Sequence, residues 1–337
     1  MSIGCVRSRG KRQEFYTSRF LGDAAQIIDT PASFPPFVHL QKPDSRAFAT
    51  LLLGGAAIAL SPILIRLADV GPVASAFWRS GLAAPLLILW AFWEREQRSG
   101  STRDSDKAQS TAATIAPLII AGLAFAGDLA FWHLSVTYTS VANATLLSNL
   151  APVFVTLGAW LAFGQRISRQ FFMAMLVAFT GVAMLVGPDF HGGGTSLWGD
   201  FLGVVTAMFY GAYMLAIKHA RERWSTALVM AASTSITALA LLPTAIAIGD
   251  TLIPSSASGW LVLVVLAVVP QVIGQSLIAY AMARLPVSLS SLSLLVQPLL
   301  ASFYASLWLG EGITALQVVG GAVVLTGIAM ARKAAAP

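Results

Sequence analysis

The sequence is poor in charged residues. Of its 337 residues, 11% are Asp, Glu, Lys or Arg and 56% are hydrophobic. Soluble globular domains carry about 25% charged residues, and a soluble protein of this size could not cover so much apolar side-chain surface. The composition therefore excludes an ordinary soluble domain and indicates a chain that faces lipid.

Residues for disulfide, metal and nucleotide chemistry are also scarce. Cys5 is the only cysteine, so no disulfide can form within the chain, and the 4 histidines lack the spacing of metal ligands. No GxxxxGK[ST] sequence occurs, which argues against ATP hydrolysis by this chain. We expect no metal, no cofactor and no catalytic residue, and we do not expect an enzyme.

Long apolar runs fill most of the chain after residue 47. A membrane-spanning helix needs about 20 apolar residues. We therefore expect an all-α polytopic membrane protein of ten transmembrane helices. The expected spans lie near 48–68, 72–93, 113–133, 140–162, 169–187, 197–217, 226–248, 259–281, 287–309 and 314–331.

Basic residues are confined to alternate joins between these runs. If the N-terminus lies on the cytoplasmic side, every Lys and Arg except Arg66 and Arg79 falls in a segment on that same side of the membrane. The joins on the other side carry only acidic charges, at Asp69, Asp189, Asp250 and Glu311. This asymmetry predicts a multi-pass protein of the inner cell membrane with both termini in the cytoplasm. It also assigns the net charge of +6 to membrane orientation, so no nucleic-acid partner is expected.

The sequence contains an internal repeat at an offset of 146 residues. The sequences LAP at 150–152 and TGVAM at 180–184 align without a gap with VQP at 296–298 and TGIAM at 326–330. One repeat unit would hold five spans, and because five is odd, the second copy enters the membrane from the opposite side. Inverted repeats that meet around a central site are a known route to alternating access.

The repeat predicts that the chain is divided into three segments. Two five-helix repeats are expected at 48–187 and 197–333, after a polar N-terminal arm at 1–47. The arm has the composition of a disordered cytoplasmic tail, and an over-extended start or a targeting segment are the alternatives.

With these features, the sequence resembles the drug/metabolite transporter superfamily, in its EamA-like branch. The resemblance rests on the ten spans, the doubled unit, the paired Pro152 and Pro298, the turns FGQR at 163–166 and LGEG at 309–312, and Arg79 after Phe77-Trp78. It covers about residues 48–331. It implies secondary transport, often export, of amino acids, other metabolites or drugs. Family members often carry Glu in both turns, whereas the first turn here has Gln165, so a shared role of two turn carboxylates is not implied.

Two ionisable residues lie within the expected spans. Such groups are costly in a bilayer and normally face protein or water. Arg79 is a candidate to bind a carboxylate-bearing solute, and the alternatives are a structural ion pair or a side chain that reaches the outer head groups. Asp128 is a candidate proton acceptor, but a salt bridge from Asp128 to Arg79 is the slightly favoured interpretation.

Other polar or aromatic residues also fall at mid-span. Trp132 follows Asp128 on one face of its helix, where a cavity wall and ordinary packing are equally supported. For Ser291 the favoured interpretation is helix packing. The remaining candidates for hydrogen bonds to a polar solute are Asn149, Tyr210, Tyr213, Gln271 and Gln275. For Asn149, Gln271 and Gln275, hydrogen bonds that hold helices together are equally supported.

These patterns predict a secondary transporter, most simply an exporter, of a small polar metabolite such as an amino acid or organic acid. Its partners would be that small-molecule substrate and the lipid bilayer. Gly199 and Gly203 form a GxxxG, for which close packing is favoured and a homodimer interface is the alternative. A channel, a receptor or an intramembrane enzyme is less supported, because no filter sequence, ligand domain or facing pair of carboxylates occurs.

Overall fold

The computed structural model describes residues 44–99, 112–139, 141–165, 167–187, 197–310 and 312–335. Every regular element in these ranges is a helix. The arm expected at 1–47 lies outside the described residues up to residue 43, and the first described helix begins at Ser45. The helices are α2 (Ser45–Ile58), α3 (Ser61–Leu67), α4 (Pro72–Ser99), α5 (Ala112–Tyr138), α6 (Val141–Ser148), α7 (Ala151–Phe163), α8 (Arg169–Val186), α9 (Leu197–Ala220), α10 (Thr226–Ile248), α11 (Ala257–Leu266), the π-helix η2 (Ala267–Gln275), α12 (Ser276–Met282), α13 (Val287–Ser293), α14 (Val296–Leu309) and α15 (Ala315–Ala334).

The described helices form 10 stretches that are long and apolar enough to cross a membrane, which confirms the expected number. Their ends agree with the expected spans to within about four residues. Large apolar side chains remain exposed on these stretches, as expected of surfaces that face acyl chains. They include Leu89, Trp93, Leu161, Leu239 and Leu307.

Three spans are each divided into two helices near a proline. Pro62 and Pro152 lie in the first turns of α3 and α7, and Pro298 is the third residue of α14. Proline has no backbone N–H, so the carbonyl four residues earlier loses its helical partner and the helix bends or ends there. The helices are interrupted beside these three prolines, whereas α4, α5 and α10 each continue through a proline.

Corresponding turns of the two repeats have the same local design. α7 and α14 end at Gly164 and Gly310, whose φ angles of 63° and 69° suit glycine. α8 and α15 then begin after Ser168 and Thr314, whose side chains accept a hydrogen bond from the third residue of each helix. Each pair of residues is separated by the offset of the repeat, so the two copies fold alike.

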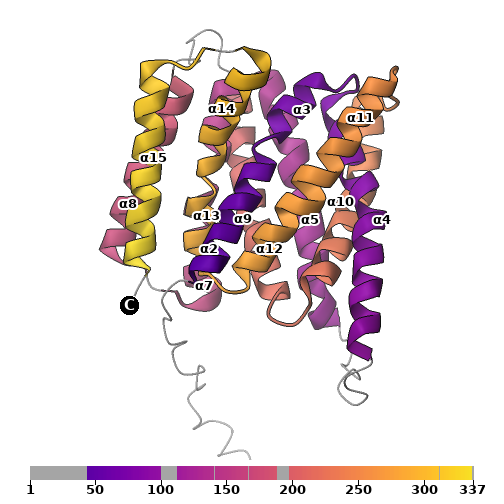
Figure 1. The fold of residues 1–337 in the computed structure, drawn as a ribbon, viewed down its shortest axis with the longest axis horizontal. Coiled ribbons are helices and arrows are strands. Elements are labelled where there is room, and N and C mark those ends of the chain that lie inside the picture. The colour runs from indigo at the N-terminus through magenta and orange to yellow at the C-terminus, as the bar shows by residue number, and fades with distance from the viewer. Residues whose placement is uncertain are drawn as a thin grey trace, which may run out of the picture. The chain divides into compact units, whose positions relative to one another are not determined.

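The two repeats pack through equivalent helices. α8 lies along α15, and α4 lies along α10 (Figure 1). The α8–α15 contact is close because Gly181 and Gly327, which correspond in the repeat, face the partner backbone: an added Cβ would lie 2.7 Å from Gly320 O or 2.6 Å from Ala178 N. Likewise α9 packs on α5, and α2 packs on η2 and α12. These exchanged contacts confirm the inverted repeat and join α4, α5, α9, α10 and η2 around the centre.

The GxxxG motif of α9 packs against other helices of the same chain. A Cβ on Gly199 would lie 2.7 Å from Thr139 N, and a Cβ on Gly203 would lie 3.0 Å from the Cβ of Leu147. The two glycines therefore let α9 approach the end of α5 and the helix α6, which is the packing interpretation of this motif.

Candidate functional site

Arg79 is held in the centre by a hydrogen-bonded chain across three helices. Its guanidinium Nε donates to Gln271 Oε1 at 2.9 Å, and Gln271 Nε2 donates to Thr234 Oγ1 at 3.1 Å. Arg79 is 5% exposed and Gln271 is completely buried. The chain joins α4 of the first repeat to η2 and α10 of the second, so the charged group bridges the two halves.

The structure gives Arg79 a neutral partner where the sequence favoured an ionic one. Among the described residues no salt bridge joins Arg79 to Asp128, although the two charges are close enough to interact electrostatically. Asp128 is half-buried, whereas Arg79 is almost completely buried. The amide of Gln271 can accept from the guanidinium without neutralising it, so Arg79 keeps a positive charge that a solute anion could compensate.

Aromatic rings form one wall of this centre. Phe125 and Tyr213 stack with centroids 4.6 Å apart, and the Arg79 guanidinium lies 5.6 Å from the Phe125 ring centroid. Tyr213 donates its hydroxyl to Gln275 Oε1 at 3.1 Å. Tyr210 lies beside Tyr213, with ring centroids 6.0 Å apart. Cation–π contact favours the charged guanidinium in an interior that otherwise opposes charge.

The π-helix η2 places both glutamines of this site. Each of its turns takes an extra residue, and Pro270 within it cannot donate a backbone hydrogen bond. Gln271 and Gln275 are buried and lie on the side that meets Arg79 and Tyr213. π-Helical turns occur frequently at functional sites.

Six of the nine residues predicted from the sequence are thus brought together. They are Arg79, Asp128, Tyr210, Tyr213, Gln271 and Gln275. The contacts that the structure gives to the other three are local. Trp132 packs edge-on against His133, Asn149 Nδ2 donates to Thr145 O at 2.8 Å beside the α6–α7 break, and Ser291 Oγ donates to Ser288 O at 2.9 Å.

Sequence reasoning missed Thr234 and did not select Gln297. Thr234 is 1% exposed and anchors the Gln271 amide, and Gln297 hydrogen-bonds to Tyr210. The available signal was the repeat itself. α10 is the repeat counterpart of α4, so a polar residue at mid-span of α10 is well placed to approach Arg79.

A second polar cluster, at the acidic end of the spans, ties the repeats together. Asp69 Oδ2 accepts hydrogen bonds from Ser255 N and Ser256 N, at 3.0 and 3.1 Å, and from both serine hydroxyls. Ser256 is the N-cap of α11. In the other direction, Asp250 Oδ2 accepts from Ala74 N at 2.9 Å, at the start of α4. Each repeat thus supplies a carboxylate to a helix N-terminus of the other, and we call this arrangement the crossed caps.

The Asp69 carboxylate of the crossed caps is charged at neutral pH. Hydrogen bonds from Ser255, and then from Ser256, lower the pKa of Asp69 below its ordinary value of 3.8. A lowered carboxyl pKa means that the stabilisation is complete above the ordinary value and is lost as the pH falls through the lowered one. Protonation of Asp69 is therefore not what opens this end under physiological conditions.

Comparison with known proteins gives one family. The sequence profile of the EamA-like transporter family matches residues 45–187 and 197–332. A solved crystal structure superposes with a TM-score of 0.71 and 18% identity, covering 86% of this chain and 98% of that one, and shows the same fold.

Curated relatives carry transporter names. An uncharacterized transporter of Archaeoglobus fulgidus is 27% identical over 57% of this chain and 67% of its own length. A probable terminal-alkyne amino-acid exporter of Streptantibioticus cattleyicolor is 32% identical over 57% of this chain and 64% of that relative. A pseudopaline exporter of Pseudomonas aeruginosa is 24% identical over 64% of this chain and 74% of that relative.

Proposed function

Because this chain belongs to the EamA-like transporter family, we propose that it exports a small polar metabolite, an amino acid or organic acid, by alternating access. Membership makes it a multi-pass membrane protein with a small-molecule substrate. Two relatives are named as exporters, one of an amino acid and one of pseudopaline, and these names favour export here.

The observation that carries the substrate class is the hydrogen bond from Arg79 to Gln271. A buried guanidinium that bonds to a neutral amide has both its charge and further N–H donors to offer. A solute carboxylate can replace the amide oxygen and form a charge-assisted, bidentate contact, which is roughly twice as strong as a neutral one. Asp128 and the hydroxyl of Tyr210 would then face the rest of the solute, including an ammonium group.

The moving parts are the two repeats, at 48–187 and 197–333. The solute would contact both, because Arg79 and Asp128 belong to the first and Tyr213 and Gln271 to the second. Rocking of one repeat against the other would open the site to each face in turn. By the distribution of basic residues, the site loads from the cytoplasm across the inner membrane, with both termini on that side.

The carboxylate requirement gives a direct test on purified protein. Ligand at about 100 times its Kd stabilises a folded protein by about 2.7 kcal/mol. We expect thermal melting to shift with a free amino acid or organic acid and not with the matched carboxamide, and Arg79→Gln to remove the shift. Equal stabilisation by an acid and its amide would show that Arg79 does not bind a solute carboxylate.

The crossed caps predict a gate at the acidic end. In a Cys5→Ser background, oxidising the pair Asp69→Cys and Ser255→Cys should stop transport, because the repeats can no longer separate there, and reduction should restore it. Cross-linking is checked by mass spectrometry, and the two single variants serve as controls. Undiminished transport by fully cross-linked protein would rule out opening at this point.

A further inference from the structure

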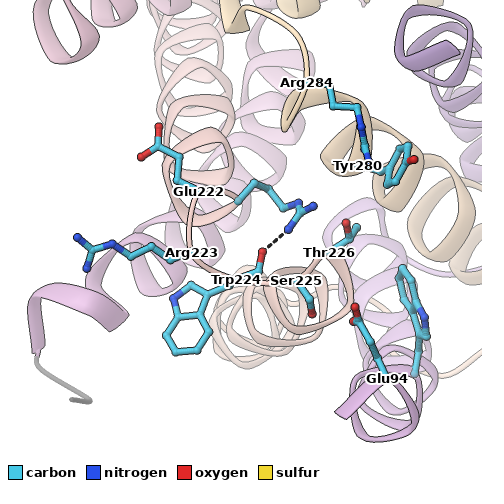
Figure 2. A pocket seen from close by; sticks show the side chains of 10 residues that line it. Glu94, Glu222, Arg223, Trp224, Ser225, Thr226, Tyr280 and Arg284 are labelled. Atoms are coloured by element: carbon cyan, nitrogen blue, oxygen red, sulfur yellow. Dashed lines mark hydrogen bonds between the residues drawn. The ribbon is translucent and has the colours of Figure 1, made fainter. Parts of the chain in front are cut away.

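A separate pocket of about 400 Å³ lies at the basic end of the spans. The end of α4, the start of α10 and the end of α12 meet there, and six of its lining residues are Trp90, Glu94, Arg221, Thr226, Tyr280 and Arg284. Arg284 and Tyr280 lie on one side of it, and Glu94 lies on another (Figure 2). None of these residues belongs to the central site around Arg79.

The pocket lies at the depth of the lipid head groups. Glu94 is close to the end of the span Pro72–Gln97, Thr226 begins the span Thr226–Ile248, and Arg284 comes two residues after the span that ends at Met282. Trp and Tyr are enriched at this depth because their rings suit the interface. Trp90 and Tyr280 in the pocket wall fit that position.

The charges of the pocket are of both signs. The Arg284 guanidinium stacks on Tyr280, 4.1 Å from the ring centroid, and the described residues provide it with no carboxylate. Arg221 is fixed by donating to the carbonyl oxygens of Ala279 and Trp224. Glu94 adds a negative charge across from Arg284. A ligand with one anionic and one cationic group therefore fits better than a simple anion.

A partly exposed stripe of side chains leads from the bilayer into this pocket. It consists of Ile273, Leu277, Tyr280 and Arg284, which follow each other at helical spacing along the end of η2 and α12. Ile273 and Tyr280 are 46% and 42% exposed, and Leu277 between them is half-buried. Apolar side chains at bilayer depth, then an aromatic ring, then a guanidinium match acyl chains, interface and phosphate in that order. A water-soluble solute would gain nothing from the apolar part of this stripe.

We propose that the pocket binds a zwitterionic phospholipid of the phosphatidylethanolamine type. The phosphate contacts Arg284, the ammonium points toward Glu94, and an acyl chain lies along Ile273 and Leu277. The site joins α4 of the first repeat to α10 and α12 of the second, so a bound lipid contacts both. This inference goes beyond the proposed transport of a solute and does not depend on it.

Native mass spectrometry of the full chain, after delipidation and addition of defined lipids, tests the site. We expect phosphatidylethanolamine to bind more tightly than phosphatidylglycerol. Arg284→Gln should weaken both about five-fold, the effect of losing one basic contact near the membrane surface. Arg169→Gln is the matched control, because Arg169 is exposed at the first residue of α8 and outside the pocket.

The variant Glu94→Gln distinguishes a specific contact between Glu94 and the lipid ammonium group from nonspecific lipid binding. It should remove the preference for phosphatidylethanolamine while leaving phosphatidylglycerol binding intact or stronger. Equal loss in the Arg284 and Arg169 variants would overturn the site. Competition by soluble phosphoethanolamine at the affinity of the whole lipid would overturn the lipid assignment, as would competition by a free amino acid. Transport need not be measured, so this test and that of the proposed function fail independently.

Discussion

Replacement of Arg79 by Gln is expected to abolish transport while leaving the protein folded in the membrane. The loss follows from the site: Arg79 is the buried cation next to Gln271 and Asp128, and the solute carboxylate would lose its charge-assisted contact. Removing one member of a buried, hydrogen-bonded charge pair costs about 2–5 kcal/mol, so kcat/KM should fall by at least about 30-fold. Uptake and counterflow in proteoliposomes measure this.

Two controls keep that result interpretable. Size-exclusion chromatography shows whether the Arg79 variant folds. The control variant Arg169→Gln removes an exposed arginine at the start of α8, which is not part of the central site. Gln271→Leu is informative in the opposite sense, because it removes the neutral partner and keeps the cation. If Arg79 binds solute directly, Gln271→Leu should retain more activity than Arg79→Gln. Normal kinetics in the Arg79 variant would remove this residue from the site.

If a proton gradient drives transport through the Asp128 carboxylate, replacement of Asp128 by Asn is expected to uncouple transport from that gradient. The amide has nearly the same shape but cannot take up a proton, and the described residues give the Asp128 carboxylate no salt bridge that would hold it charged. Accumulation driven by a pH gradient should fall to background, while exchange of solute across the membrane continues. Radiolabelled solute in proteoliposomes, with and without an imposed gradient, distinguishes the two activities.

A different result is expected if Asp128 has no part in proton coupling. If the carboxylate only balances the charge of Arg79, then Asp128→Asn should weaken binding and leave the pH dependence of transport unchanged. The double variant Arg79→Gln with Asp128→Asn adds a further comparison. A balancing pair should lose less in combination than the sum of its single losses, because neither charge is then left alone.

Much of the fold could be predicted from the sequence because a bilayer imposes strong rules. Span length and the alternation of basic joins fix the number of helices. The missing N–H is one cause of the interruptions near Pro62, Pro152 and Pro298, but it does not decide them alone, because α4, α5 and α10 continue through a proline. The inverted arrangement followed from an odd number of spans in each copy.

The hydrogen-bonding partners within the site could not be predicted in the same way. Sequence spacing places Gln271 and Gln275 on the same helix but does not reveal the π-helical turns that set their direction. A small change in helix rotation decides whether Arg79 meets Asp128 or Gln271. Thr234 was hidden for a related reason, because Ser and Thr are common at mid-span as packing residues. The repeat marks α10 as the helix that faces Arg79, but it does not select which polar residue of α10 bonds to the Gln271 amide.

The crossed caps have a mechanical consequence. Asp69 caps the start of α11 and Asp250 caps the start of α4, so hydrogen bonds hold the two repeats together at two separate points of the acidic end. While both hydrogen-bonded contacts hold, the acidic ends of the two repeats stay together, so the repeats would separate more easily at the opposite, basic end. In the proposed alternating-access cycle, the acidic end would act as the hinge while both contacts hold, and it would open only when both are released together.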